Sequence, residues 1–255
     1  ASQMTADFLA GRIALVTGAG RGNGAAIAHG LAQAGAKVIV TDVDRQTAHD
    51  TAEAITRAGG EARGFALDVT DEEGCRKLAE DIALLVGPVR ILVNNAGIFL
   101  RGGFAAAEGR ERWARTMAVN VQGTFNVTMA FLDQLKQTKG VIVNVASTNS
   151  FVAPPGSGAY PVSKGAIAQF TRGLAAELAA DGVRVNAIAP GIIATAMTEV
   201  TRADPQRLDA FLAHVPMKRV GQPEELAGPV VFLCSDAASY VTGAVLPIDG
   251  GYLVV

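Results

Sequence analysis

Residues 13–24 read I-A-L-V-T-G-A-G-R-G-N-G, an aliphatic run that leads into a glycine-rich turn and then into a helical pattern. Glycine lets the backbone turn sharply and approach a ligand closely, and the first turn of a helix presents free N–H groups to a pyrophosphate. The spacing Gly18-x-x-x-Gly22-x-Gly24 differs from the G-x-G-x-x-G fingerprint, because Asn23 stands at its third glycine. A glycine-rich turn alone is often only a tight connection. Its place between a first strand and a helix predicts nucleotide binding.

Segments typical of strands and of helices alternate from this turn to the end of the chain. Short aliphatic runs at 13–17, 37–41, 62–67, 89–94, 140–146, 183–188 and 244–248 predict strands. Helical periodicity predicts helices between them, at 25–34, 45–58, 71–86, 110–135, 160–180 and 224–235. Near-continuous apolar strands separated by helices predict an α/β fold with a parallel sheet covered on both faces. No change of composition divides the chain, so we expect residues 1–255 to form one domain.

The composition is typical of a well-packed globular protein. Hydrophobic residues make up 49% of the 255 residues and charged residues 18%, and 29 are glycine. The net charge of −2 gives no reason to expect nucleic acid or an anionic membrane as a partner. Cys75 and Cys234 lie far apart without metal-ligand spacing, and residues 1–12 lack the apolar core of a signal peptide. We expect a soluble, cytoplasmic protein with reduced thiols, no metal site and no membrane span.

Asp42 ends the second predicted strand, twenty residues after Gly22. A carboxylate there can hold the ribose hydroxyls of NAD, and it repels the extra phosphate of NADP. Two unit charges about 4 Å apart near a surface interact by about 4 kcal/mol. Arg21, in the glycine turn, can reach that phosphate or can simply be a solvated loop residue. Asp42 therefore predicts NAD, with NADP as the less favoured cofactor.

Further polar and small residues follow the third and fourth predicted strands. Asp68 and Val69 are placed to contact an adenine, although Asp68 is equally suited to cap a helix. After the fourth strand the chain reads Asn94, Asn95, Ala96 and Gly97. Small residues there let the backbone lie close to a ribose, while Asn94 can instead tie neighbouring strands together. Asn120 lies inside the predicted helix 110–135, where asparagine is unfavourable, so its amide is either exposed or has a task.

Residues 147–164 read S-T-N-S-F-V-A-P-P-G-S-G-A-Y-P-V-S-K and join a buried strand to a helix. Tyr160 and Lys164 are four residues apart, so they share one face of that helix. An ammonium near a phenol favours the phenolate, and a fall of about 3 units in pKa would bring Tyr160 near neutral pH. Ser147 can offer its hydroxyl to the same reacting oxygen. Such a pair is common on helix surfaces, so its significance depends on its surroundings.

Together these residues resemble the short-chain dehydrogenase/reductase family over essentially the whole chain. The matching motifs are T-G-x-x-x-G-x-G at residues 17–24, Asn94-Asn95-Ala96-Gly97, Asn120, Ser147, Tyr160-x-x-x-Lys164 and Pro190-Gly191. The resemblance implies a Rossmann-type, doubly wound parallel sheet of about seven strands. It also implies the exchange of hydride with a nicotinamide cofactor.

The resemblance also implies roles for individual residues. Tyr160 is the general acid/base, Ser147 orients and polarises the substrate carbonyl, and Lys164 holds the nicotinamide ribose and lowers the pKa of the tyrosine. Asn120 positions a water in a proton relay to Lys164. The residues implied to line the nicotinamide are Pro190, Gly191, Ile193 and Thr195.

Two features depart from or refine the family pattern. Asn23 is polar where the family usually has isoleucine or leucine, so we expect altered contacts with the cofactor. Pro161 directly follows the tyrosine, and its missing N–H is tolerated only in the first turn of a helix. Tyr160 should therefore lie at the very start of its helix, where the positive end of the helix dipole also favours a phenolate.

The substrate and the assembly are predicted less directly. Residues 195–219 are expected to form a substrate lid. Asn149, near Ser147, suits a hydroxylated substrate, or it can simply satisfy backbone groups of the turn. We expect an NAD-dependent enzyme that interconverts a polyol or sugar-type secondary alcohol and its ketone. The alternatives are a 3-oxoacyl thioester reductase, against which Asp42 argues, and a non-catalytic dinucleotide-binding sensor. Apolar residues on several faces of the helices at 110–135 and 160–180, with the apolar tail 252–255, suggest subunit contacts, with burial inside the chain as the alternative for each segment. The family is commonly tetrameric.

Overall fold

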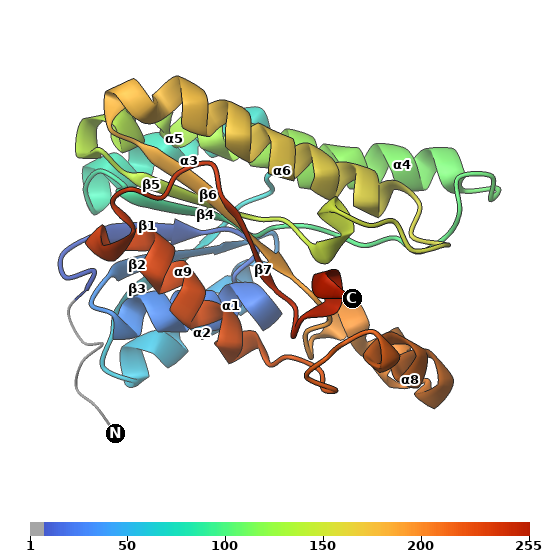
Figure 1. The fold of residues 1–255 in the computed structure, drawn as a ribbon. Helices are drawn as coiled ribbons and strands as arrows, with labels where there is room; N and C mark the ends of the chain where they lie inside the picture. Colours follow the sequence, from blue (N-terminus) through green and yellow to red (C-terminus); the bar gives the residue numbers. More distant parts are fainter. Residues whose placement is uncertain (1–7) are drawn as a thin grey trace.

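The computed structural model describes residues 8–255, so most of the segment tested for a signal peptide lies outside the described residues. Its centre is a seven-stranded sheet in the order β3-β2-β1-β4-β5-β6-β7 (Figure 1). The strands are β1 Ile13–Val16, β2 Lys37–Asp42, β3 Glu61–Ala66, β4 Ile91–Asn94, β5 Val141–Val145, β6 Arg184–Pro190 and β7 Val245–Ile248. Every neighbouring pair is parallel. The predicted doubly wound parallel sheet is confirmed, and each predicted strand is present within two residues of its bounds.

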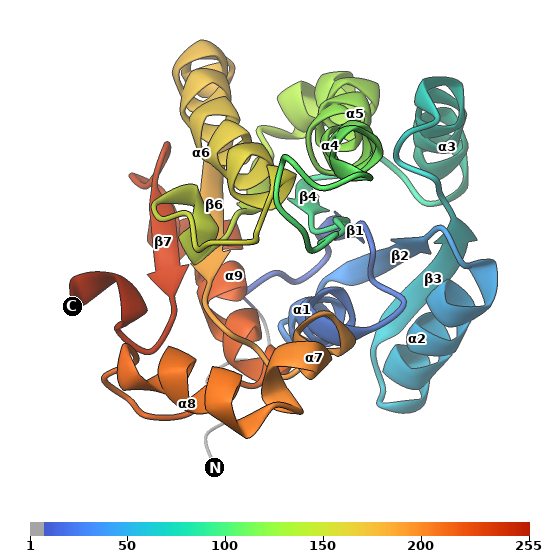
Figure 2. The ribbon, with the colours of Figure 1, turned by 90° about the vertical axis from the view of Figure 1, so that its right-hand side faces the viewer.

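Helices cover both faces of the sheet. They are α1 Gly22–Gln33, α2 Arg45–Arg57, α3 Glu72–Leu85, α4 Gly109–Met117, α5 Thr124–Thr138, α6 Ala159–Leu178, α7 Glu199–Arg202, α8 Pro205–Ala213 and α9 Ala227–Cys234. Figure 2 shows α1, α2 and α9 on one side of the strands and α3, α4, α5 and α6 on the other. No helix among residues 8–255 is both long and apolar enough to cross a membrane.

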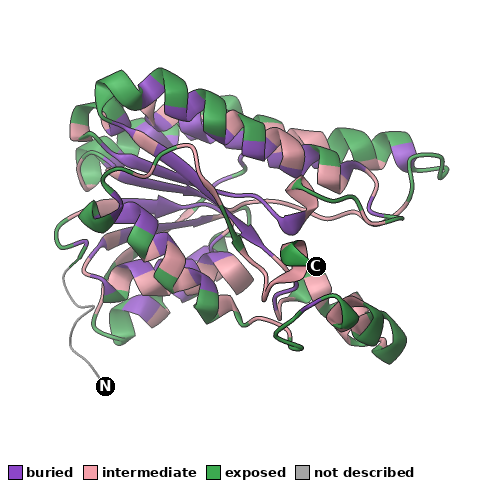
Figure 3. Cartoon of the chain, viewed as in Figure 1, coloured by how far each residue is buried: buried purple, intermediate pink, exposed green. Residues whose placement is uncertain are grey.

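The two faces of the sheet form two apolar cores. On one face, Ile27 of α1 packs in a cluster with Leu233 of α9. On the other, Phe131 of α5 packs in a cluster with Ile82 of α3 and Leu174 of α6. The central strands are buried along their length (Figure 3). Burial on both faces explains why the strands read as continuous apolar runs rather than as alternating ones.

The order of the strands reverses between β1 and β4. Chain connections leave β1 towards β2 and β3 on one side, and run from β4 towards β7 on the other. In an open α/β sheet this switch point opens a crevice at the carboxyl ends of the strands. The loops that follow β1, β4 and β5 carry the glycine turn, Asn95 and Ser147, so the fold brings these predicted residues to one edge.

The predicted helix 110–135 differs in one respect. It forms as α4 and α5, joined by a stretch of π-helix at Ala118–Gly123 that contains Asn120. A π-turn inserts one extra residue into the helix and is frequent at functional sites. The inserted turn rotates the following helix face, which lets a polar side chain at Asn120 be buried while the apolar face of α5 still meets the sheet.

Buried amides join the middle of the sheet to the helices above it. Asn94 and Asn144 are register partners on β4 and β5, and the Asn94 amide nitrogen donates to the Asn144 side-chain oxygen at 2.9 Å. Asn94 also donates to Thr128 of α5, and Asn144 donates to Thr171 of α6. The alternative that Asn94 ties neighbouring strands together is therefore confirmed.

The segment predicted as a lid is helical. Residues 195–219 contain a short 3-10 turn, α7 and α8, which lie together beside the carboxyl edge of the sheet (Figures 1 and 2). The ring of Tyr252 stacks on Phe211 of α8, with centroids 4.8 Å apart and planes at 3°. Part of the apolar C-terminal tail is therefore used within the chain, while Val254 and Val255 are exposed.

Candidate active site

Tyr160 and Lys164 lie at the start of α6, as the sequence predicts. Tyr160 is the second residue of the helix and Pro161 the third, so the missing N–H of the proline falls in the first turn. The Lys164 ammonium nitrogen lies 5.7 Å from the centre of the Tyr160 ring. Lys164 is almost fully buried, and its Nζ donates a hydrogen bond of 2.6 Å to the Val145 carbonyl. The structure thus places a buried cation beside the phenol.

Ser147 follows β5 and faces the same phenol. Its hydroxyl accepts a hydrogen bond from the Asn149 backbone N–H at 3.1 Å, which caps a 3-10 turn at Thr148–Ser150. Ser150 in turn donates to the Lys164 carbonyl at 2.7 Å and fixes this turn against α6. The serine is thereby held at one end of the turn, within reach of Tyr160.

Burial sets the ionisation of the two reactive groups. It raises the pKa of Tyr160 to about 12, and a hydrogen bond with Ser147 lowers that pKa only in part. Burial also lowers the pKa of Lys164 to about 8. The expected fall in the pKa of Tyr160 is therefore wrong for the protein chain by itself, because the loss of water around the phenol outweighs the hydrogen bond with Ser147. Both shifts favour the neutral form, and both are typical of reactive sites.

Asn120 occupies the π-turn and clamps the loop that follows β4. Its side-chain oxygen accepts the Ile98 N–H at 2.8 Å, and its amide nitrogen donates to the Ile98 carbonyl at 3.0 Å. The same nitrogen donates to the Ser163 hydroxyl at 3.0 Å, and this hydroxyl donates to the Tyr160 carbonyl. A side chain on Gly97 would come within 3.2 Å of the Asn120 oxygen and 3.5 Å of the Lys164 nitrogen. Asn120, Gly97 and Lys164 therefore meet at one point.

The glycine turn is shaped as a cradle. Gly18 and Gly22 have φ of +59° and +56°, which other residues rarely adopt. A methyl group on Gly24 would lie 2.3 Å from the Gly18 carbonyl oxygen and 2.5 Å from the Asn95 amide nitrogen. Helix α1 begins at Gly22 with no side-chain cap and no acidic residue in its first turn, so its positive end can meet an anion.

Asn23 provides a second sign that the turn fits a ligand. Its side-chain oxygen is buried and has no hydrogen-bond partner among residues 8–255. A buried acceptor without a donor is costly. Phosphates offer only acceptors, whereas ribose hydroxyls offer donors, so a dinucleotide contains groups that satisfy this oxygen. The cradle and this acceptor fit the predicted cofactor.

Asn95 serves the glycine turn differently from the prediction. Its amide nitrogen donates to the carbonyls of Thr17 and Gly18, each at 2.9 Å. The backbone N–H groups of Asn95 and Ala96 both donate to the Thr17 hydroxyl at 3.0 Å. These bonds tie the loop after β4 to the loop after β1. The Asn95 side chain is therefore used to shape the cradle. The backbone near Ala96 and Gly97 remains for contact with a ribose.

Asp42 also binds the glycine turn. One carboxylate oxygen accepts the Gly20 N–H at 3.0 Å, and the other accepts the Asp44 N–H at 3.1 Å. Each carboxylate oxygen has two lone-pair positions, so one on each remains for ribose hydroxyls. Arg21 is exposed at the rim of the turn and takes part in no ion pair among the described residues.

Asp68 and Val69 lie beyond β3 with more ordinary contacts. Asp68 accepts hydrogen bonds from the backbone and hydroxyl of Thr70, at 2.9 and 2.7 Å. The cap of α3 is instead Asp71, so the alternative role of Asp68 as a helix cap is wrong. Val69 is buried, and its carbonyl accepts from Asn126 of α5 at 3.0 Å.

The loop after β6 reaches the glycine turn from the other side. Pro190 is buried at the end of β6, and the Gly191 N–H donates to Ile248 at 3.0 Å. Ile193 is buried, and Thr195 follows it as the cap of the first lid turn. A side chain on Gly22 would lie 3.4 Å from the Thr195 methyl group. The predicted nicotinamide loop therefore faces the start of α1.

Two residues at the mouth of the site, Phe99 and Arg101, were not predicted from the sequence. The ring of Phe99 lies against that of Tyr160, with centroids 4.6 Å apart and planes at 33°. The Arg101 guanidinium carbon lies 4.7 Å from the centre of the Phe99 ring. Arg101 also donates to the Thr201 hydroxyl of α7 at 2.8 Å. Their position after Asn94–Gly97 was the available signal, since loops at strand ends carry binding residues.

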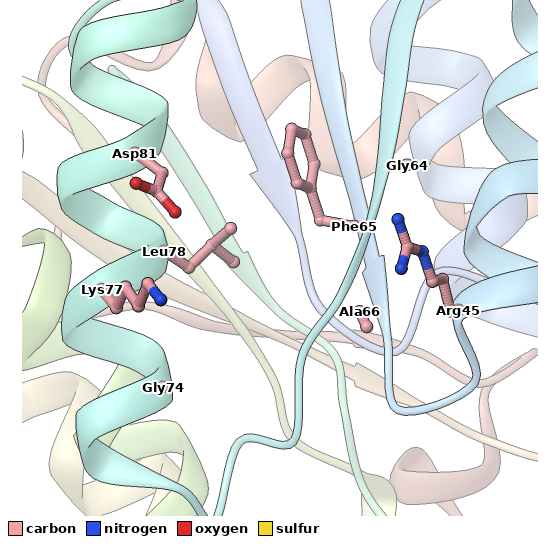
Figure 4. Close-up of a pocket in the computed structure, with 8 residues that line it drawn as sticks. All are labelled: Arg45, Gly64, Phe65, Ala66, Gly74, Lys77, Leu78 and Asp81. Carbon is pink, nitrogen blue, oxygen red and sulfur yellow. The ribbon is translucent and has the colours of Figure 1, made fainter.

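A separate cavity of about 340 Å³ lies at the outer edge of the sheet, between α2, β3 and α3. Figure 4 shows its lining, with Arg45, Phe65, Lys77 and Asp81 among the residues. None of the residues predicted for the site lines it. The chemistry-bearing residues are gathered instead at the switch point of the sheet.

Comparisons with known proteins agree with this arrangement. The adh_short_C2 family model, described as enoyl-(acyl carrier protein) reductase, matches residues 18–253. Galactitol 2-dehydrogenase (L-tagatose-forming) of Cereibacter sphaeroides is 44% identical over 254 residues, covering 96% of each chain. The 3-oxoacyl-[acyl-carrier-protein] reductase FabG of Aquifex aeolicus is 41% identical over 250 residues, covering 95% of this chain and 98% of the reductase. The structure of a gluconate 5-dehydrogenase from Burkholderia cenocepacia, in complex with NADP and tartrate, superposes with a TM-score of 0.94 at 35% identity, covering 99% of this chain and all of that one.

Proposed function

The chain belongs to the short-chain dehydrogenase/reductase family of oxidoreductases, and on that premise we propose that it interconverts a polyol or sugar-type secondary alcohol and its ketone with NAD. The observation that carries the proposal is the convergence of Tyr160, Lys164, Ser147 and Asn120 beside the glycine cradle. A bound nicotinamide supplies the acceptor or donor of hydride. The remaining chemistry, which is proton transfer and substrate orientation, falls to side chains of this protein.

Tyr160 moves the proton. With a pKa of about 12 its phenol is protonated at neutral pH, so it is ready to donate to the oxygen of a ketone that becomes an alkoxide. In the reverse direction the phenolate accepts the hydroxyl proton of the alcohol as hydride leaves its carbon. The Lys164 ammonium stabilises that phenolate. Ser147, held by Asn149, donates to the same substrate oxygen and fixes its position.

A screen of NAD+ reduction over alditols and secondary alcohols tests the reaction. We expect turnover by the wild-type protein and a fall of about 10² to 10⁴ in kcat for Tyr160→Phe, because the proton transfer is lost. Tyr240→Phe is the matched control, since Tyr240 is fully exposed and remote from the site in sequence. Full turnover by Tyr160→Phe would show that the enzymatic assignment is wrong.

The preference for NAD rests on Asp42. Its carboxylate is fixed at the end of β2 by two backbone N–H groups, and a carboxylate after the second strand of such a sheet would bind ribose hydroxyls and repel the additional phosphate of NADP. The Burkholderia relative was solved with NADP, so both cofactors belong in the assay. Asp42→Asn keeps an oxygen for the Gly20 N–H and removes the charge. We expect the ratio of kcat/KM for NADP+ to kcat/KM for NAD+ to rise at least about tenfold in this variant. A tenfold change requires less free energy than the repulsion of about 4 kcal/mol between two like charges at close range. Asp50→Asn, on the exposed face of α2, is the control for this ratio. A preference of the wild-type protein for NADP+ would overturn the assignment of NAD.

A 3-oxoacyl thioester reductase is the second candidate, favoured by the identity with the Aquifex reductase. Reduction of an acetoacetyl thioester with NADH and NADPH distinguishes the two. Activity on the thioester that exceeds activity on every polyol ketone would favour this candidate.

We also propose a homotetramer in the cytoplasm. Large apolar side chains remain exposed on the helical face opposite the sheet, including Phe125 of α5 and Val162 of α6. Both cysteines are buried thiols, which persist in a reducing compartment. Light scattering should give four times the chain mass of 26.2 kDa, and a monomer would contradict it. Cell fractionation tests the location.

A further inference from the structure

Arg101 lies at the mouth of the site and links it to the lid. The guanidinium carbon lies 4.7 Å from the centre of the Phe99 ring, which lies 4.6 Å from the centre of the Tyr160 ring. The guanidinium is therefore within about 9 Å of the reactive ring, a distance that a sugar-sized molecule spans. The side chain is exposed, and it reaches across to Thr201 on α7. Arg101 therefore stands where a substrate between the phenol and the lid would end.

The charge of Arg101 is not neutralised within the described chain. Arg112 and Arg115, on the neighbouring α4, pair with Glu108 and Glu111 one helical turn away. Arg101 has no carboxylate within 4.0 Å among residues 8–255. Of the five N–H donors of its guanidinium, only one forms a hydrogen bond within these residues, to Thr201. The Phe99 ring below the guanidinium carbon and the Thr201 hydroxyl hold the group in place, and its remaining N–H donors have no partner within the described chain.

We propose that Arg101 binds a carboxylate at the end of the substrate remote from the reacting carbon, so that the substrate is a hydroxy acid of sugar type. This inference rests on the proposed function and narrows its substrate class. A guanidinium offers two parallel N–H donors that match a carboxylate, and such charge-assisted bonds are about twice as strong as neutral ones. One unpaired cation matches one negative charge, which favours a carboxylate over a doubly charged phosphate.

The position of Arg101 also suits discrimination between substrates with a terminal carboxylate and neutral substrates. The hydroxylated middle of the substrate would face Ser147 and Asn149, while its terminal charge would lie between Phe99 and α7. Binding at that end adds equally to the ground state and the transition state, so its loss should raise KM more than it lowers kcat. A role confined to fastening the lid would instead affect charged and neutral substrates alike.

The test compares acids with alcohols of the same configuration. Oxidation of D-gluconate and D-galactonate is measured beside D-glucitol and galactitol, with D-glucitol 6-phosphate as the phosphate arm. We expect wild-type kcat/KM to be higher for the aldonates. Arg101→Gln should lower aldonate kcat/KM at least about tenfold, mainly through KM, and should change the alditol values by less than about threefold. Arg101→Lys should recover only part of the loss, because it lacks the planar fork.

Arg115→Gln is the matched control, since Arg115 carries the same charge on α4 but is already paired with Glu111. Calorimetric titration of the NADH-loaded protein with D-gluconate gives a reading that needs no turnover, and Arg101→Gln should weaken that binding. Turnover of alditols with no preference for aldonates, or an equal loss for both in Arg101→Gln, would overturn this inference and leave the proposed function standing. A preference for the phosphate would replace the carboxylate. No turnover of any of these compounds, with no binding of gluconate, would remove both proposals.

Discussion

Replacing Lys164 by methionine should remove activity. The stability of the variant relative to the wild-type protein should be greater at neutral pH than at alkaline pH. Lys164 is 4% exposed, and burial lowers the pKa of its ammonium from 10.5 to about 8. Below pH 8 the lysine is protonated in both the folded and the unfolded chain, so the folded chain carries the full cost of burying the charge. At 1.36 kcal/mol per pKa unit this cost is about 3 kcal/mol.

The sign of the pH dependence follows from the lowered pKa. As pH rises above 8 the folded lysine loses its proton before the unfolded one, so the cost disappears and stability rises towards pH 10.5. By pH 9.5 about 2 kcal/mol should be recovered. Tyr160 acts in the opposite sense at higher pH. Its pKa is raised from 10.0 to about 12, so the stability it contributes is lost as pH rises from 10 to 12. The interval from pH 7.0 to 9.5 therefore isolates Lys164.

Urea-induced unfolding of the wild-type protein and Lys164→Met, at pH 7.0 and 9.5 and at one protein concentration, measures this effect. The methionine leaves the Val145 carbonyl without its Lys164 partner, a loss of about 1–3 kcal/mol that is the same at both pH values. The expected signature is thus the difference between the two pH values, with the variant favoured by about 2 kcal/mol more at pH 7.0. Lys37→Met, on a half-exposed lysine paired with Glu61, is the control. A stability difference that does not change with pH would show that the Lys164 charge is not buried at a cost.

Three further substitutions test the cradle and the core. Gly24→Ala, whose methyl group would lie 2.3 Å from the Gly18 carbonyl, should raise the Kd for NAD+ at least about tenfold in calorimetry; unchanged affinity would contradict the cradle. Asn144→Ala should lower the free energy of unfolding by about 3 kcal/mol in urea, because the buried Asn94 amide loses one of its two acceptors and the buried Thr171 hydroxyl loses a donor. Asn23→Leu removes a buried oxygen without a partner, so it should raise the free energy of unfolding by about 1 kcal/mol and weaken NAD+ binding; equal or tighter binding would show that this oxygen does not contact the cofactor.

The fold could be predicted because its signals are local and repeated. Strands buried on both faces must be apolar along their length, and the helices between them must carry an apolar stripe. The alternation of strands and helices is therefore visible as a pattern of apolar residues in the sequence. The start of α6 was also predictable, since Pro161 restricts Tyr160 to the first turn. Residues tied to strand ends, such as Ser147 and Asp42, were placed correctly for the same reason.

Features that depend on contacts between distant segments could not be predicted in this way. The π-turn at Asn120 is a change of hydrogen-bond register that no residue type specifies. The raised pKa of Tyr160 depends on how much water the finished fold excludes, and helical spacing reveals only that an ammonium is near. Arg101 lies in a loop whose path is set by Asn120 and α7, so its approach to Phe99 appears only in three dimensions.

Asn120 connects these features, and the π-turn explains how it can do so. In a regular helix a buried amide at this position would compete with the apolar contacts of α5, whereas the inserted turn gives it a place of its own. From there it holds both polar groups of the Ile98 backbone and the Ser163 hydroxyl, which in turn binds the Tyr160 carbonyl. The loop that carries Phe99 and Arg101 and the helix start that carries Tyr160 are therefore fixed to one side chain. Because the group that would bind the substrate and the group that transfers the proton share this anchor, the distance between them is set by a single rigid clamp rather than by the packing of two independent segments.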